Sequence, residues 1–171
     1  MDFFTLTEKR QSVRSYLDRE IEADKVSDLL QAVNRAPSAG NLQAFEVVVA
    51  RSSAARRSLA TAAGQQEFVA QAPLALVFCA HPARSSQKYQ ARGEQLYSIQ
   101  DATIACTYAM LAATALGLAS VWVGAFDAKQ VRTALHLPAG WLPVAILPLG
   151  YPAESPRQTL RRKLDDLVHE L

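Results

Sequence analysis

The sequence predicts an α+β fold of three layers, an α/β/α sandwich in which helices cover both faces of one sheet. Segments with apolar residues at helical spacing alternate along the chain with short apolar runs typical of buried strands. The 171 residues contain no repeat, low-complexity block or Gly/Ser-rich linker, and this length can bury a substantial core. We therefore expect one domain over residues 1–171, with 152–171 as a C-terminal tail.

In the first half of the chain, the helix over 23–35 has the clearest signature, because Val26, Leu29 and Val33 fall on one face. Pro37 ends it, since the residue before a proline avoids the helical region. Gly64 similarly ends a later helix. The elements expected in this half are helices over 2–9, 23–35 and 53–63 and strands over 45–50 and 74–80.

The second half is expected to begin, after His81-Pro82, with a polar helical stretch that carries Tyr89 and Tyr97. Asp127 and Gln130 have the spacing of a capping box and start a later helix. The remaining elements expected here are a long uncharged helix ending near 116–117 and strands over 120–124 and 144–151.

The long helix needs separate treatment, because no charge occurs between Asp101 and Asp127 and a membrane span is therefore a competing interpretation. The stretch is mostly Ala and Thr, and Gly117 interrupts it. Its end, Val121-Trp122-Val123, favours a strand. We expect a helix buried on nearly every side, followed by a central strand, with no membrane contact.

The net charge of +2 is too small to indicate a nucleic-acid partner by itself. Basic residues nevertheless gather at two places, without the interleaved aromatic residues that stack on bases. The two groups are Lys9, Arg10 and Arg14, and Arg157, Arg161, Arg162 and Lys163. A small anion bound by both groups fits this pattern better than a nucleic acid.

Cys79 and Cys106 lie in apolar surroundings and are expected to be free, buried thiols in a reducing compartment. The three histidines share no metal-ligand spacing with them, so we expect no metal. The N-terminus has neither the basic nor the long apolar segment of a signal peptide. A cytoplasmic location is the expectation.

The segment Ala36-Pro37-Ser38-Ala39-Gly40-Asn41-Leu42-Gln43 lies between an expected helix and an expected strand. Gly40 permits a positive φ or a close backbone approach. Asn41 and Gln43 supply amides that both donate and accept hydrogen bonds, so the loop can recognise the edge of a flat heterocycle. The same residues also suit an ordinary turn.

Four motifs, in this order and spanning nearly the whole chain, together resemble the nitroreductase family of flavin enzymes. They are Arg10-Gln11-Ser12-Val13-Arg14, the 36–43 loop, the Gly117–Phe126 segment, and Pro148–Pro152 followed by a basic tail. The resemblance implies a mixed sheet and an intertwined homodimer. It also implies that the tail, 152–171, packs on the partner subunit.

The resemblance implies a flavin mononucleotide (FMN) site. Arg10 and Ser12, with Gln11 between them, would contact the phosphate, and forked, permanently charged arginines suit a phosphate well. Arg14 would lie near the ribityl chain and the N1/O2 edge of the ring, where a cation stabilises negative charge. A plainer alternative is that Arg10 and Arg14 form surface ion pairs with nearby acidic residues.

The other cofactor contacts implied by the resemblance come from three segments. Asn41 and Gln43 would bond the ring edge or the ribityl hydroxyls, with Pro37 and Ser38 shaping the approach. The backbone of Trp122, Val123 and Gly124, an ordinary core strand in the plainer interpretation, would donate near N5 and O4. Arg161 and Arg162 of the tail would add to the phosphate contacts. The chain departs from the family pattern after Gln43, with Ala44-Phe45 in place of Pro-Trp.

No side chain shows the pattern of a general acid, base or nucleophile, and this suits a flavin enzyme because the cofactor carries the hydride chemistry. The resemblance implies alternating reduction by NADH or NADPH and oxidation by a nitroaromatic, quinone or similar small acceptor. Tyr89 and Tyr97 are candidate substrate-lid residues. The alternatives are other flavin chemistry, such as ene reduction, dehalogenation or flavin fragmentation, and a flavin-binding protein without turnover.

Overall fold

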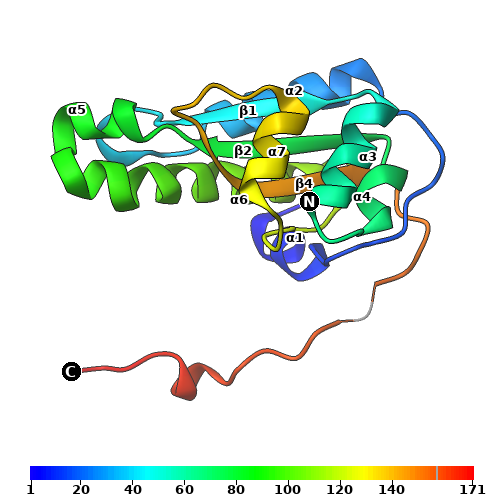
Figure 1. The fold of residues 1–171 in the computed structure, drawn as a ribbon. Helices are drawn as coiled ribbons and strands as arrows, with labels where there is room; N and C mark the ends of the chain where they lie inside the picture. The colour runs from blue at the N-terminus through cyan, green and yellow to red at the C-terminus, as the bar shows by residue number, and fades with distance from the viewer. Residues whose placement is uncertain (157) are drawn as a thin grey trace.

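A computed structural model describes residues 1–156 and 158–171; Arg157, one member of the second basic group, lies outside the described residues. Figure 1 shows one sheet with helices on both faces, as the sequence predicts. The helices are α1 (Phe3–Lys9), α2 (Ala23–Asn34), α3 (Ser53–Ala62), α4 (Glu67–Gln71), α5 (Pro82–Arg92), α6 (Ser98–Ala115) and α7 (Ala128–Leu135). The strands are β1 (Phe45–Ala50), β2 (Leu74–Ala80), β3 (Ala119–Ser120) and β4 (Leu142–Gly150).

The sheet has the order β1-β2-β4-β3, and all pairs of these strands are antiparallel. The parallel pairing of the described residues is limited to one bridge, between Ser12 and Ser120, so the mixed sheet implied by the resemblance exists only at this edge. The strand expected over 120–124 is shorter than predicted. Its pairing with β4 ends after Ser120 and returns only at a single bridge between Val123 and Ile146.

Two apolar layers hold helices to the two faces of the sheet. One layer packs α2 and α6 on β2 and β4, through residues such as Leu29, Ala109 and Phe78. The other layer packs α3, α4 and α7 on the opposite face, through residues such as Leu59 and Val131. Every residue of β2 is buried, as expected for a central strand covered on both sides. Cys79 and Cys106 are free and buried, as expected.

Helix α6 corrects one expectation, because it is buried along one face and not on nearly every side. Asp101, Ala105 and Ala109 are buried, whereas Thr107 and Tyr108 are exposed. After Asp101 the helix carries small and hydroxyl-bearing side chains, which leave it without further charge but do not make it strongly apolar. Among the described residues, no helix is long and apolar enough to cross a membrane.

Two elements were not anticipated. The short helix α4 has too few residues to show a periodic pattern. A single turn of π-helix, η2 (Gly93–Tyr97), joins α5 to α6. At Gly93 a Cβ atom would lie only 2.5 Å from the Ser85 carbonyl oxygen, so this backbone geometry leaves room for glycine alone.

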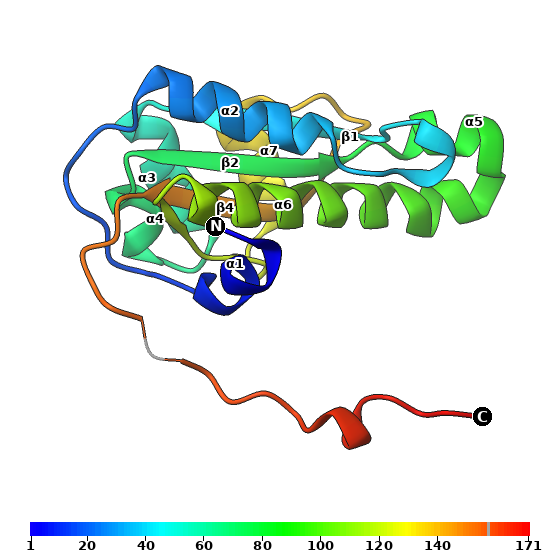
Figure 2. The same cartoon turned by 180° about the vertical axis from the view of Figure 1, so that it is seen from behind.

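The C-terminal tail leaves the sheet after β4 and extends away from the body of the chain (Figure 2). It contains one short 3-10 turn, η3 (Leu164–Asp166). Leu160, Leu164 and Leu171 are largely exposed, so the described residues do not bury these apolar side chains. The docking of the tail on a partner subunit therefore stays a prediction.

Candidate functional site

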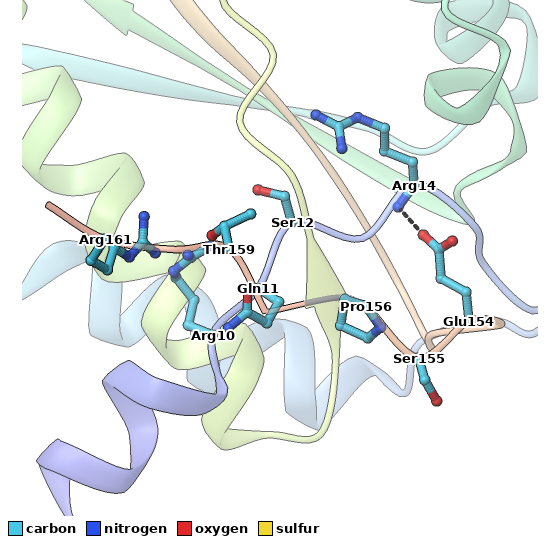
Figure 3. Close-up of a pocket in the computed structure, with 9 residues that line it drawn as sticks. All are labelled: Arg10, Gln11, Ser12, Arg14, Glu154, Ser155, Pro156, Thr159 and Arg161. Carbon is cyan, nitrogen blue, oxygen red and sulfur yellow. Dashed lines mark hydrogen bonds between the residues drawn. The ribbon is translucent and has the colours of Figure 1, made fainter.

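A cavity of about 470 Å³ opens where the segment after α1 meets the root of the tail (Figure 3). It is lined mostly by polar and cationic side chains. The lining residues are Arg10, Gln11, Ser12, Arg14, Glu154, Ser155, Pro156, Thr159 and Arg161. Five of the predicted cofactor-binding residues thus share one cavity: four assigned to the phosphate (Arg10, Gln11, Ser12 and Arg161), and Arg14, assigned to the ribityl chain and ring. Residues from the two basic groups meet there. Arg162 does not line it, because its guanidinium bonds the Asp166 carbonyl within the tail.

Backbone pairing places the two sides of this cavity. The Arg10 N–H bonds the Leu6 carbonyl at 3.0 Å and closes α1. The Val13 N–H then bonds the Ser120 carbonyl at 3.2 Å, which attaches the segment to the edge of the sheet. On the other side, Ala153 N–H donates to Ser15 carbonyl at 2.9 Å and ties the tail root to the same segment.

The cavity concentrates positive charge. Burial lowers the pKa of the Arg10 guanidinium, and the charge of Arg161 lowers this pKa further. Among the described residues Arg10, Arg14 and Arg161 form no ion pair with a carboxylate, so the surface pairs of Arg10 and Arg14 weighed as a plainer alternative are not found there. Two facing guanidiniums without a counterion favour the binding of an anion.

Arg14 has a different orientation from Arg10. Its guanidinium carbon lies 5.9 Å from the ring centre of Phe68, and Figure 3 shows the side chain directed away from Arg10 and Arg161. Its backbone N–H donates to the Glu154 carboxylate at 2.7 Å. This arrangement agrees with separate tasks for the two arginines, one at the phosphate and one farther along a bound cofactor.

The 36–43 loop is held by a buried carboxylate, Asp101, that no sequence motif singles out. Asp101 of α6 accepts the N–H of Ala39 at 2.9 Å and that of Ala44 at 3.3 Å, so it fixes the middle of the loop and the residue that follows it. The Ser38 hydroxyl accepts the Gln43 N–H at 2.9 Å. Ser38 therefore shapes the loop, as predicted. Only the uncharged context of Asp101 could have hinted at a buried role.

Three residues of the loop have a positive φ: Gly40 at 57°, Asn41 at 56° and Gln43 at 48°. Left-handed backbone is costly for residues with a side chain. Strain of this kind gathers at functional sites, where surrounding structure holds it in place. The bonds from Asp101 and Ser38 supply that restraint, which favours a binding loop over an ordinary turn.

The two predicted lid residues pack on each other and on this loop. The rings of Tyr89 and Tyr97 meet edge to face, with centres 5.0 Å apart. The Tyr89 hydroxyl lies so close to Gly40 that a Cβ there would be 2.5 Å from it. Arg92 donates to the Tyr97 hydroxyl at 2.9 Å. The structure thus brings the lid residues to the loop and not to the cationic cavity.

The predicted backbone donors at 122–124 are only partly free. The Val123 N–H donates to the Ile146 carbonyl at 2.9 Å, so it is already used within the sheet. Gly124 is exposed, and its N–H has no backbone partner among the described residues. This corrects the expectation for Val123 and leaves Gly124 as the remaining candidate donor.

Within one chain, the predicted site residues therefore form two separate groups. The loop lies beside α5 at one end of the molecule, whereas the segment that follows α1 lies near the other end (Figure 2). Pro37, Ser38, Asn41 and Gln43 belong to the first group, and Arg10, Ser12 and Arg161 to the second. In the part of the chain that the structure covers, no three His, Cys, Asp or Glu side chains gather as metal ligands.

The fold agrees with comparisons to known proteins. The model of the Nitroreductase family matches residues 7–66 and 60–151. The "NADH dehydrogenase" of Thermus thermophilus is 33% identical over 195 residues, covering 98% of this chain and 95% of that protein. The "FMN reductase (NAD(P)H)" of Bacillus subtilis is 29% identical, covering 97% and 72%. A nitroreductase family protein from Clostridium difficile 630 superposes with a TM-score of 0.87 at 33% identity, covering 99% and 98%.

The match and the fold define the chain as an α+β protein of the flavin-reductase type, with a sheet enclosed by helices. The chain belongs to the Nitroreductase family. It is accordingly an oxidoreductase that uses a flavin and NAD(P)H.

Proposed function

We propose that the protein is an FMN-dependent oxidoreductase that takes hydride from NADH or NADPH and reduces nitroaromatic, quinone or similar small acceptors. The observation that carries the choice of FMN is the cavity containing Arg10, Ser12 and Arg161. The guanidiniums of Arg10 and Arg161 and the Ser12 hydroxyl are donors of the kind that a terminal phosphate prefers. Among the described residues neither guanidinium is ion-paired with a carboxylate, although Glu154 also lines the cavity.

The residues present fit this cofactor. Arg10, Ser12 and Arg161 would hold the phosphate, and Arg14 would supply positive charge farther along the cofactor. Asn41 and Gln43 would orient the ring through its polar edge, and Gly124 would offer a backbone N–H. When bound, FMN supplies the ring that accepts and donates hydride. The protein's part is to bind and orient it and to restrict access to its exposed face.

We further propose a homodimer in which each site is completed by two chains. The cationic cavity and the 36–43 loop lie at different ends of one chain, yet both carry residues suited to one cofactor. Bringing the loop of one protomer to the cavity of its partner would unite them. The exposed leucines of the tail would then be covered by the partner.

No side chain of the site is assigned a proton-transfer role. The reductant and the acceptor would bind alternately at the same open face, which predicts ping-pong steady-state kinetics. Tyr89 and Tyr97 lie over the loop and would border that face. A cytoplasmic location stays a prediction, in keeping with two free and buried cysteines.

The test begins with the purified protein loaded with FMN. Its flavin absorbance near 450 nm should bleach under NADH or NADPH without oxygen, and return when a quinone or a nitroaromatic is added. Failure to bind FMN would overturn the proposal. Binding without bleaching by either nicotinamide would favour a flavin-binding protein without turnover. Bleaching followed by no response to these acceptors would point to other flavin chemistry.

A further inference from the structure

Glu154 is the one carboxylate that lines a cavity otherwise rich in arginine. It forms no ion pair with Arg10, Arg14 or Arg161 among the described residues. Its carboxylate instead accepts the backbone N–H of Arg14 at 2.7 Å (Figure 3). A negative charge beside the proposed phosphate site disfavours the binding of a phosphate, so the position of Glu154 needs an explanation.

The position of Glu154 at the root of the tail supplies that reason. Tyr16 pairs with Pro152 in an antiparallel bridge, and the Ala153 N–H bonds the Ser15 carbonyl at 2.9 Å. One residue later, the Glu154 carboxylate accepts a hydrogen bond from the Arg14 N–H, and this short ladder ends there. Beyond Glu154, the described residues Ser155, Pro156 and Thr159 line the cavity, and Arg161 lies near Arg10 (Figure 3).

We propose that Glu154 is a specificity-determining residue that acts on phosphate binding in two opposing ways. Its hydrogen bond to Arg14 fixes where the tail leaves the sheet, and this positions Arg161 in the cavity. Its negative charge repels a bound phosphate dianion across the same cavity. This inference rests on the proposed function, because it assumes that the cavity takes the phosphate of FMN.

The two roles can be separated, because they require different atoms. Glu154→Gln keeps an oxygen that accepts the Arg14 N–H and removes the charge. We expect this variant to bind FMN about threefold to tenfold more tightly than the wild type. Glu154→Ala also removes the acceptor and so releases the tail. We expect it to bind FMN about fivefold or more weakly than the Gln variant.

The measurement is a titration of flavin-free, full-length protein with FMN, with riboflavin as the probe that lacks a phosphate. Riboflavin affinity should be the same in the wild type and the Gln variant. Glu20→Gln is the matched control, since Glu20 is exposed and forms no ion pair among the described residues. It makes the same change in net charge and should leave FMN affinity unchanged.

The positioning role has its own readout in the Arg161→Ala background. If Glu154 acts by placing Arg161, the difference between the Gln and Ala variants should disappear once Arg161 is removed. A difference that persists would overturn the positioning role. A Gln variant that binds FMN no more tightly than the wild type, or that gains equally for riboflavin, would overturn the charge role.

Failure of the proposed function gives a different result. In that case the wild type would bind FMN no better than riboflavin, and Arg161→Ala would change neither affinity. A wild type that prefers FMN, combined with an unaltered Glu154→Gln variant, would retain the phosphate site and remove only the inference about Glu154.

Discussion

The two halves of the proposed site are built in different ways. The 36–43 loop is attached to the buried Asp101 through Ala39 within the loop and Ala44 just after it, and it holds several residues in left-handed backbone. The cationic cavity lies at the edge of the sheet, between one short segment and the exposed root of the tail. Internal hydrogen bonds restrain the loop, whereas the cavity depends on contacts that exposed residues make.

This difference indicates a division of tasks. A flat ring must be oriented closely for hydride transfer, and a restrained loop supplies that orientation. A phosphate needs charge more than exact placement, and it can be held by long side chains on an adjustable tail. Damage to the loop should therefore be seen first in folding stability, and damage to the cavity first in binding.

The largest effect is expected at Asp101. Asp101→Ala removes the acceptor of two backbone N–H groups, of Ala39 and Ala44, and should lower the free energy of unfolding by about 3 kcal/mol. Urea unfolding measures this loss. Asp101→Asn keeps one acceptor oxygen, so its free energy of unfolding should lie between those of the wild type and Asp101→Ala. The matched control is Asp28→Ala on the exposed face of α2, which should change stability by less than about 0.5 kcal/mol. A loss as small as the control's would mean that the loop does not depend on Asp101.

Removing Arg10 should have the opposite signature. Arg10→Ala is expected to weaken FMN binding by about 1.5–3 kcal/mol, roughly tenfold to a hundredfold, because a charge-assisted contact is lost. Riboflavin binding and the urea midpoint should change little. The exposed Arg57→Ala serves as the control for lost charge. Equal weakening of FMN and riboflavin would show that Arg10 does not contact the phosphate.

The predictability of these two regions also differs. Apolar periodicity was sufficient for β1 and β2, whose bounds match the predicted ranges, and for most of the helices. The four motifs identified the family and five of the residues in the cavity. The sequence could not identify Asp101 as a support of the loop, because the contact joins residues about 60 positions apart. Glu154 was missed for the same reason, since its partner Arg14 lies 140 residues away.

The restraint on the loop can be measured with a pair of glycines. Gly40 and Gly64 both have positive φ, at 57° and 71°, but a Cβ at Gly64 would meet nothing within 4 Å. Gly64→Ala should thus report backbone strain alone, about 1 kcal/mol. Gly40→Ala should cost about 1 kcal/mol more, because its Cβ would press on the Tyr89 hydroxyl. Adding Tyr89→Phe should recover part of that excess. Equal losses at the two glycines would show that the lid does not press on the loop.

The smallest effect is expected from lowering the pH, which acts on Glu22 beside the root of the tail. The Tyr151 hydroxyl donates to Glu22, and this bond, with smaller contributions from a backbone bond and Arg19, lowers the pKa of Glu22 to about 2. A carboxylate whose pKa is depressed by folding stabilises the native state above its ordinary pKa of about 4.5. That stability is lost as the pH falls from about 4.5 towards about 2. Urea midpoints between pH 6 and pH 3 should therefore fall less steeply for Glu22→Gln than for the wild type.

Glu20→Gln is the control for this measurement and should keep the wild-type slope. The backbone carbonyl of Tyr151 accepts the Leu17 N–H at 2.9 Å. The bond between Tyr151 and Glu22 therefore lies beside the segment that carries Arg14. Because the native Glu22 carboxylate is protonated only as the pH approaches about 2, FMN binding should weaken more in the wild type than in Glu22→Gln only near that pH, when both are compared with riboflavin. If FMN binding has the same pH dependence in the two proteins, the bond at the tail root does not influence the cavity. It would also remove the adjustable character that distinguishes the cavity from the loop.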